Sequence, residues 1–399
     1  MGKLAAPWGS RSRKSREGRS TTKVLHLIKT LYAGGAEIHL LTLCRGLRER
    51  AVDVTVATLC RRIPAGEPIE ERFEDLGVPV IHLQEHPGLS LAASCALARL
   101  LLLEQPTLLH THLPRADVVG ALAGALAPGL RRISSIHDIY SVHWAGRRAL
   151  PLLDRVWRRA DRLIAASEAV RDWLAVDRRI PRERIDVVRY GIEAARFARP
   201  SRDLRREWGL DKGIVIGSAA RLEPRKGHED LIRAIPAILA AFPGAVLLIA
   251  GHDLEGYRPT LERLIGSLSL QEHVRLVGFQ RDIVSFLYAL DLFVFASRSE
   301  GFGQIVIEAM ASGRPVVAAR AGAIRELVVE GETGLLVDLA SPAAIAGAVI
   351  SLLGQPSRMR TMGLRGVDRV RRRFDAARMT AEILDVYNDV ACLSRRGSP

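Results

Sequence analysis

Short apolar runs alternate with amphipathic segments along the chain, and the alternation begins at Lys23. A short run rich in Val, Ile and Leu predicts a strand, whereas apolar positions three or four residues apart predict a helix. In the first half, the expected strands are Val24 to Lys29, Val52 to Leu59, Val78 to Leu83, Leu108 to His110, Arg131 to Ile136 and Ile185 to Val188. Helical spacing ends near Arg50 and recurs from about Pro151 to Ala160 and from Glu168 to Val176. Strands that alternate with helices indicate βαβ units and a parallel sheet.

The same alternation starts again after a polar segment, Glu193 to Lys212, which contains Pro200 and many charges. The expected strands of the second half are Ile214 to Ala219, Ala245 to Ala250, Val274 to Val277, Leu292 to Ala296, Pro315 to Ala319 and Thr333 to Val337. The expected helices between them include Gly227 to Leu239, Arg258 to Ser267 and Ile283 to Ala289. The second half is therefore predicted to repeat the architecture of the first.

This pattern predicts an α/β protein with two tandem Rossmann-like, doubly wound domains that face each other across a cleft. We expect a disordered basic tail at 1–20, a first domain at 21–192, a linker at 193–212, a second domain at 213–372 and a C-terminal helix and tail at 373–399. Sites in such sheets lie at the carboxyl ends of the strands, so the two domains are expected to share one site.

Composition narrows the choice of partner. A chain of 399 residues with 48% hydrophobic residues has enough apolar material for two cores. A net charge of +14 indicates an anionic partner. The sequence shows no zinc-finger spacing, recognition-helix signature or RNP-like aromatic run, which argues against nucleic acid. Phosphorylated ligands and lipid headgroups remain as candidates.

The cysteines and apolar runs bear on localisation. The four cysteines lie far apart, at Cys44, Cys60, Cys95 and Cys392. This spacing favours a reducing compartment, buried thiols and no structural metal. The most apolar runs, Leu89 to Leu103 and Ala234 to Gly251, are interrupted by Arg99 and by two prolines, so neither is expected to cross a bilayer. Because no apolar segment follows the basic tail as in a signal peptide, we expect a cytoplasmic protein.

Two features at predicted strand ends of the first domain are candidate binding groups. Gly34 and Gly35 stand between a strand and a helix, where bare backbone N–H groups can approach an anion, although the same pair also suits an ordinary helix start. His110, His112 and His137 are each expected just past a strand end. A single histidine there is usually structural, whereas three at one edge of a sheet favour a functional role.

Two features of the second domain carry more specific chemistry. Arg221 and Lys226 follow its first strand, and a planar guanidinium with a mobile ammonium suits a diphosphate. In the stretch SEGFGQIVIE, two acids stand on either side of a glycine-rich helix start, Glu300 before it and Glu308 after it. Carboxylates accept hydrogen bonds from sugar hydroxyls, while backbone N–H groups of Gly301, Phe302 and Gly303 face a phosphate. Such an arrangement suits a nucleotide sugar.

Taken together, these motifs resemble the family 4 retaining glycosyltransferases of the GT-B fold. The resemblance spans about residues 22 to 390 and rests on Glu-x7-Glu at 300 to 308, the Arg221 and Lys226 pair, Gly-Gly-x-Glu at 34 to 37 and the run ADRLIAASE at 160 to 168. One departure is Gly322-Ala323-x-x-Glu326, where the family often has Gly-Gly-x-x-Glu.

The resemblance implies a role for each matching residue. Glu300 is expected to bind the donor sugar, Glu308 the ribose, and Arg221 with Lys226 the diphosphate. Gly34 and Gly35 are expected at the phosphates, and His137 near the donor sugar and acceptor. Glu300, Arg221, Lys226 and His137 are thus the candidate catalytic residues, and Gly34, Gly35, Glu308, Gly301, Phe302 and Gly303 the candidate donor-binding residues. Residues 277–283 fall where the family packs the nucleobase.

The reaction implied is transfer of a sugar from a nucleotide-diphosphate sugar to a sugar or lipid-linked acceptor. Front-face attack would retain the anomeric configuration. No cofactor is expected, and because the chain has no Asp-x-Asp triplet, basic groups rather than a metal ion are expected to neutralise the leaving diphosphate. Two alternatives remain: a sugar-nucleotide 2-epimerase of the same fold and a binding protein without turnover.

An anionic membrane surface is a further candidate partner. The helix expected after Pro151 carries Arg155, Arg158, Arg159 and Arg162 beside Trp157, with Trp144, Arg147 and Arg148 just before it. A basic cluster on the acceptor-side domain suits anionic headgroups at the inner face of the membrane. The alternative is a solvated helix face, with Leu152, Leu153, Val156 and Leu163 in the core.

Overall fold

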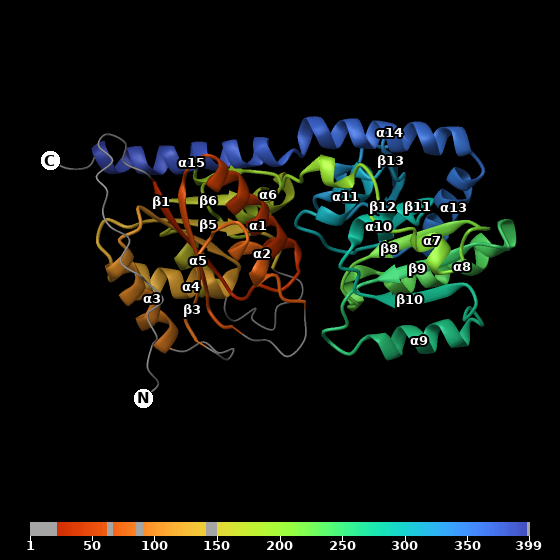
Figure 1. The fold of residues 1–399 in the computed structure, drawn as a ribbon, viewed down its shortest axis with the longest axis horizontal. Helices are drawn as coiled ribbons and strands as arrows, with labels where there is room; N and C mark the ends of the chain where they lie inside the picture. Colours follow the sequence, from red (N-terminus) through yellow and green to blue (C-terminus); the bar gives the residue numbers. More distant parts are fainter. Residues whose placement is uncertain (1–21, 62–66, 85–90, 141–149, 397–399) are drawn as a thin grey trace.

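The computed structural model contains two parallel sheets side by side (Figure 1), and it describes residues 22–61, 67–84, 91–140 and 150–396. The first sheet has the order β3-β2-β1-β4-β5-β6-β7. Its strands are β1 (Lys23–Ile28), β2 (Asp53–Thr58), β3 (Val80–His82), β4 (Leu108–His112), β5 (Arg131–Ile136), β6 (Arg162–Ala165) and β7 (Ile185–Val187). Its helices are α1 (Gly35–Glu49), α2 (Glu70–Glu74), α3 (Leu91–Glu104), α4 (Pro114–Gly124), α5 (Leu150–Trp157) and α6 (Glu168–Val176), with the 3-10 turn η2 (Arg182–Arg184).

The second sheet has the order β10-β9-β8-β11-β12-β13. Its strands are β8 (Val215–Ala219), β9 (Val246–Ala250), β10 (Val274–Gly278), β11 (Leu292–Phe295), β12 (Val316–Ala319) and β13 (Gly334–Val337). The remaining helices are η3 (Ala194–Phe197), α7 (Leu204–Glu207), η4 (Pro224–Lys226), α8 (His228–Ala241), α9 (Arg258–Ser267), α10 (Ile283–Tyr288), α11 (Gln304–Ala311), α12 (Ile324–Leu327), α13 (Pro342–Leu353), α14 (Pro356–Arg373) and α15 (Ala376–Arg396). The prediction of two doubly wound domains is confirmed.

In both sheets the strand order reverses at one place, between β1 and β4 and between β8 and β11. The loops after two neighbouring strands lead to opposite faces of the sheet there, and a crevice forms at the carboxyl ends of these strands. The Gly34 loop follows β1, the Arg221 loop follows β8, and Glu300 follows β11. The motifs found in the sequence therefore lie at the two positions where this topology places ligands.

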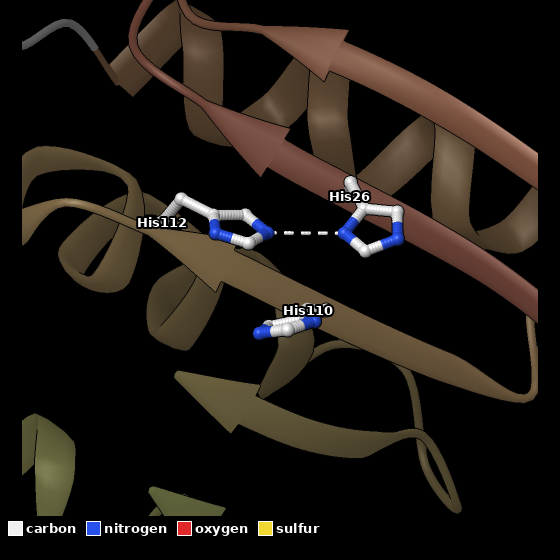
Figure 2. Close-up of side chains that lie close together, drawn as sticks. All are labelled: His26, His110 and His112. Atoms are coloured by element: carbon white, nitrogen blue, oxygen red, sulfur yellow. Dashed lines mark hydrogen bonds between the residues drawn. The ribbon is translucent and has the colours of Figure 1, made fainter. Parts of the chain in front are cut away.

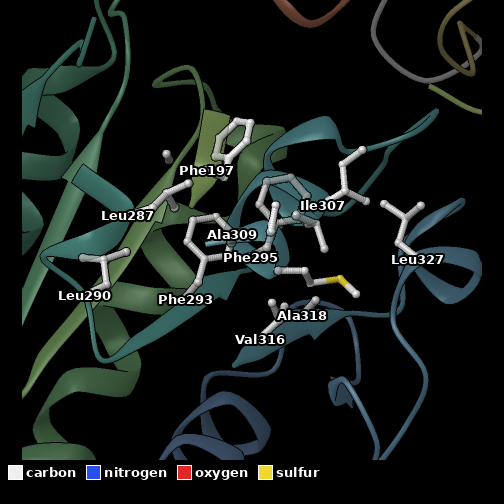
Figure 3. Close-up of a cluster of buried hydrophobic side chains, with 14 of the residues drawn as sticks. Phe197, Leu287, Leu290, Phe293, Phe295, Ile307, Ala309, Val316, Ala318 and Leu327 are labelled. Carbon is white, nitrogen blue, oxygen red and sulfur yellow. The ribbon is translucent and has the colours of Figure 1, made fainter. Parts of the chain in front are cut away.

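Buried apolar side chains explain why the second sheet forms. Strands β11 and β12 are apolar on both faces, as a parallel strand covered by helices on both sides must be. Figure 3 shows Phe293 and Phe295 of β11 packed with Ile307 of α11 and with Phe197. Since Phe197 belongs to η3, the segment predicted as a polar linker contributes to this core.

The last helix returns to the first domain. Helix α14 lies over the second domain, and α15 continues across to the first (Figure 1). On α15, Met379, Ile383, Tyr387 and Val390 are buried in the same core as Val24 of β1. The C-terminal segment thus ties the two domains together, and no periodicity within it shows which sheet it covers.

Several expectations about the basic cluster and the cysteines were wrong. Arg162 and Leu163 lie on β6, a strand that the sequence pattern did not reveal, and not on the preceding helix. Trp157 is fully buried and donates its indole N–H to Asp117 at 2.9 Å, whereas Leu152 is 48% exposed rather than in the core. Cys44 and Cys60 are buried as expected, but Cys95 and Cys392 are exposed. Trp144, Arg147, Arg148 and the tail at 1–20 lie outside the described residues.

Candidate active site

A buried ion pair between Lys226 and Glu300 lies at the switch point of the second sheet. Lys226 ends the short turn η4 after β8, and its Nζ donates to Glu300 Oε1, which also accepts from Ser297 Oγ at 3.1 Å. Burial disfavours the charged form of the carboxyl, but the ammonium of Lys226 and the guanidinium of Arg225 outweigh burial and lower the pKa of Glu300. Glu300 is therefore a carboxylate at neutral pH, able to accept hydrogen bonds.

Arg225, which the sequence analysis did not select, is more closely engaged here than Arg221. Arg225 Nη1 donates to Asp138 Oδ2 of the first domain at 3.2 Å, and its Nε lies 2.6 Å from Glu223 Oε1. The side chain of Arg221 is 47% exposed and lies 3.3 Å from Glu223. Arg225 therefore joins the two domains, while Arg221 stands at the rim with donors open to solvent. The repeated basic residues of the loop were the available signal, but spacing alone does not show which of them turns inward.

The glycines of the SEGFG loop lie where a side chain would collide. A Cβ on Gly301 would approach the backbone oxygen of His137 to 2.2 Å, so this loop packs directly against the first domain. Gly303 has φ +89° and precedes α11, a conformation that L residues rarely adopt. Phe302 is buried with its ring 4.6 Å from that of Tyr190. These contacts set the position of Glu300 relative to the first domain.

Glu308 lies on the second turn of α11, away from the Lys226 pair. Its Oε1 accepts from Gln304 Nε2 at 2.8 Å. Burial raises the pKa of Glu308 to about 7, and the charges of Arg196 and Arg72 oppose that rise. The two acids of Glu-x7-Glu therefore have different surroundings: Glu300 is paired with a buried cation and stays ionised, whereas Glu308 has a neutral amide partner and gains a proton near neutral pH.

The Gly34 turn begins α1, and the Glu37 carboxylate lies against Gly34, since a Cβ there would approach Glu37 Oε2 to 2.5 Å. Gly34 is the N-cap of α1 and makes no side-chain cap, while Gly35 has nothing within 4 Å of where a Cβ would stand. Glu37 lies in the first turn of the same helix, and burial raises its pKa to about 7 against the opposing charges of Arg221 and Lys29. The helix start thus presents backbone donors beside a carboxyl group that changes charge near neutral pH.

Three histidines of the first domain, His26, His112 and His137, form a buried hydrogen-bonded chain. His26 Nδ1 lies 3.0 Å from His112 Nε2 (Figure 2), and His112 Nδ1 lies 3.1 Å from His137 Nε2, whose other nitrogen bonds the hydroxyl of Tyr190. His110 bonds Tyr387 at 2.7 Å and Ser135 at 2.8 Å. His110 and His112 lie within β4 rather than past its end, which corrects the expectation from the sequence.

Burial keeps this chain neutral. It lowers the pKa of His26 and of His137 to about 3, and burial together with the neighbouring histidines holds the pKa values of His39, His110 and His112 well below their ordinary value. Both ring nitrogens of His137 are engaged within the first domain, so in this arrangement its ring stabilises the loop that meets Gly301.

Three of these histidines could also hold a metal ion. His26, His110 and His112 each offer a ring nitrogen, and the three nitrogens lie within 4.8 Å of one another (Figure 2). Hydrogen bonds already engage both nitrogens of His110 and of His112. Within the described part of the chain, His26 Nε2 has no partner. The hydrogen-bonded chain therefore accounts for most of the cluster without a ligand.

Two doubly wound domains with a buried Lys–Glu pair at the switch point of the second sheet define a class of two-domain α/β proteins that bind a ligand at their strand ends. Comparison with known proteins identifies the family within this class. The model of the family described as Glycosyltransferase Family 4 matches residues 33–196, and that of Glycosyl transferases group 1 matches residues 200–367. A D-inositol 3-phosphate glycosyltransferase from Salinispora tropica is 30% identical over 94% of this chain and 85% of its own length. The chain therefore belongs to the family 4, group 1 glycosyltransferases of the GT-B fold.

Further relatives are similar in sequence and in structure. A GDP-mannose-dependent alpha-(1-6)-phosphatidylinositol monomannoside mannosyltransferase from Mycolicibacterium smegmatis is 34% identical over 62% of this chain and 68% of its own length. The crystal structure of HepE from Anabaena in complex with UDP and glucose is similar with a TM-score of 0.82 at 25% identity, covering 92% of this chain and 99% of that one. Among the described residues, no helix is long and apolar enough to cross a membrane.

Proposed function

We propose that this glycosyltransferase moves a hexose from a nucleotide-diphosphate sugar to an acceptor hydroxyl, with retention of configuration and without a metal ion. The observation that carries the proposal is the buried pair of Lys226 and Glu300 at the switch point of the second sheet. A crystal structure similar to this chain contains UDP and glucose, which supports a nucleotide sugar as the donor.

The chemistry follows from the charges. As the sugar leaves, negative charge grows on the diphosphate, and Lys226 with Arg221 stabilises it more in the transition state than in the ground state. Glu300, ionised beside Lys226, accepts hydrogen bonds from sugar hydroxyls and fixes the orientation of the ring. The acceptor attacks on the face from which the diphosphate leaves, and a phosphate oxygen takes the acceptor's proton.

A donor and acceptor screen tests the proposal. Each common nucleotide sugar is incubated with the enzyme, and release of nucleoside diphosphate is followed with and without acceptor. Because two relatives are named for inositol phosphate and phosphatidylinositol mannoside, D-inositol 3-phosphate and phosphatidylinositol glycolipids begin the acceptor panel. An α-linked product from an α-linked donor supports retention, whereas a β-linked product contradicts it. A donor converted to its 2-epimer without any acceptor would indicate an epimerase instead.

We further propose that the enzyme works in synthesis of cell-envelope polysaccharide, lipopolysaccharide or glycolipid at the cytoplasmic face of the membrane. Arg155, Arg158 and Arg159 are exposed on or just after α5, with Leu152 exposed on the same helix. Cations and an apolar side chain on one helix suit a surface of anionic lipids, where each basic residue contributes about 1 kcal/mol. The protein is expected to sediment with phosphatidylglycerol vesicles at low salt and to be released at high salt. Failure to bind at low salt would contradict the membrane proposal and leave the transferase proposal intact.

A further inference from the structure

Glu326 makes contacts that its sequence position does not reveal. It lies on α12 of the second domain, yet its carboxylate points to the first domain. There Oε2 accepts from the backbone N–H of Glu168 at 3.2 Å, and Oε1 accepts from that of Ala169 at 3.0 Å. Arg189 adds two donors to Oε2, Nε at 3.0 Å and Nη2 at 2.8 Å. A single side chain of one domain thus fills the N-terminus of a helix in the other.

The N-terminus of α6 explains why a carboxylate binds at this place. The first N–H groups of a helix have no partner within it and carry a partial positive charge, so a carboxylate there is stabilised. In α6, Ser167 accepts from Val170 at 3.1 Å, and Glu326 supplies acceptors for the two preceding amides. The guanidinium of Arg189 neutralises the remaining charge of the carboxylate.

The same helix end also contacts the SEGFG loop. Ser167, which is fully buried, donates its hydroxyl to the backbone oxygen of Gly301 at 2.7 Å. In the second domain, the backbone N–H of Ala323 donates to the backbone oxygen of Glu300 at 3.3 Å. A Cβ on Gly322 would approach the same backbone oxygen to 2.1 Å. The segment that carries Glu326 is therefore in direct backbone contact with Glu300.

Helix α12 is also bound to α14 of its own domain. Arg369 of α14 donates to the backbone oxygen of Leu327 at 2.7 Å and to that of Glu326 at 2.6 Å. The backbone of Glu326 is thus bound to its own domain while its carboxylate is bound to the other. Any separation of the domains at this point must break the carboxylate contacts, because the backbone is anchored.

We propose that Glu326 is a positioning residue that holds the two domains in the arrangement seen here and places Glu300 against the His137 loop of the first domain. Its effect on turnover rests on the proposed function, whereas its effect on the domain arrangement does not. Glu326 touches neither Lys226 nor the carboxylate of Glu300 in the described contacts, so it acts through α6 and the SEGFG loop.

The variants separate this role from a general loss of stability. Glu326→Gln keeps the shape of the side chain and removes its charge, and Arg189→Met removes the partner. The matched control is Glu330→Gln, because Glu330 lies four residues further on and pairs at 2.9 Å with Arg320 of its own domain. Thermal unfolding of each variant shows whether the fold persists.

The domain arrangement is measured with two spin labels, one on each domain. Cys95 of α3 is exposed and serves as one site, and Glu262→Cys on α9 supplies the other, in a Cys392→Ser background. We expect longer and broader distance distributions for Glu326→Gln and Arg189→Met than for the Glu330→Gln control. Arg189→Met leaves the amides of Glu168 and Ala169 on the Glu326 carboxylate and also removes a contact of Arg189 with Glu168 at 3.4 Å, so its effect should be smaller than that of Glu326→Gln. The effects of the two substitutions should not add in the double variant, since both weaken the Arg189–Glu326 pair.

Activity gives the second readout. Turnover is expected to fall at least tenfold in Glu326→Gln, while affinity for nucleoside diphosphate, measured by calorimetry, changes less than twofold. Unchanged distance distributions in folded Glu326→Gln and Arg189→Met would overturn the proposal. If no donor supports turnover in the wild-type protein, the proposed function fails, and the distance measurement still decides the role of Glu326.

Discussion

The facing edges of the two sheets bury polar groups in opposite ways. The first domain places five histidines in a neutral network in which burial lowers each pKa, and His137 ends its hydrogen-bonded chain at Tyr190. The second domain buries opposite charges, Lys226 with Glu300 and Arg225 with Glu223. A neutral network shapes a surface without adding charge, whereas buried ions are poised for a charged ligand. The comparison indicates that the histidine network of the first domain is structural, whereas the ion pairs of the second domain take part in the reaction. The following predictions test this division.

The largest effect is expected on the charged edge. Lys226→Ala should lower kcat about 10²- to 10³-fold, as for loss of a transition-state donor, or about 2.7–4 kcal/mol. Lys212→Ala, an exposed lysine of the linker, is the control and should leave kcat unchanged. Arg221→Ala should lower kcat at least tenfold. Steady-state release of nucleoside diphosphate measures all three. Wild-type rates in Lys226→Ala would show that the ion pair is only structural.

The next effect separates the two acids. Glu300→Gln should reduce kcat more than donor affinity, because its carboxylate lies beside the cation at the reacting centre. Glu308→Gln should mainly weaken nucleotide binding, since this acid lies on the second turn of α11 with Gln304. Calorimetric titration of nucleoside diphosphate, together with kcat, distinguishes them. Equal weakening of nucleotide binding in both variants would contradict this assignment.

The neutral histidine network of the first domain should determine how the stability of the fold changes in acid. Histidines with a pKa near 3 in the folded protein stay unprotonated at pH 5. In the unfolded chain the same histidines take up a proton below about pH 6.5. Stability therefore falls as pH falls from about 6.5, by at most about 1.4 kcal/mol per pH unit for each histidine. Glu37 and Glu308, with a pKa raised to about 7, and Asp117, raised to about 6, act in the opposite sense.

Burial also lowers the pKa of His228 to about 4 and raises the pKa values of Asp138 and Asp186. The histidines outnumber the acids, so we expect Tm to decrease between pH 6.5 and pH 5. His110→Gln should flatten this decrease, because the unfolded chain then has one fewer group that takes up a proton. His273→Gln, at a histidine bonded to Ala245 outside the network, is the matched control. Thermal unfolding at several pH values provides the measurement. A Tm that is constant from pH 7 to pH 5 in the wild type would argue against a neutral network.

The smallest effect is expected from metal ions. If the histidines serve each other as partners, neither EDTA nor equimolar zinc should change Tm or turnover. Metal analysis of the purified protein and thermal unfolding with and without zinc check this prediction. A clear rise in Tm with zinc, abolished in a His26→Gln variant, would instead make His26, His110 and His112 a metal site. Loss of turnover with EDTA, restored by magnesium, would contradict metal-independent catalysis.

The sequence revealed most of the fold because periodicity records burial. Apolar runs such as Val24 to Lys29 and Leu292 to Ala296 predict strands that are covered on both faces, and the structure has β1 and β11 at these positions. β6 was missed because Arg162 and Asp161 precede only a short apolar run, which continues the pattern of α5. The return of α15 to the first domain also escaped prediction, since an amphipathic helix shows an apolar face but not the surface that it covers.

The sequence by itself determined the parallel architecture, the loops that follow β1, β8 and β11, and the residue types that suit a diphosphate and a sugar. Only the tertiary structure decided that Arg225 rather than Arg221 turns inward to Asp138, that Gly301 lies against His137, and that Glu326 binds α6. The physical reason is the distance along the chain over which each interaction acts. Strand and helix patterns arise from neighbours a few residues apart, whereas these contacts join residues far apart in the chain and depend on how the two domains pack.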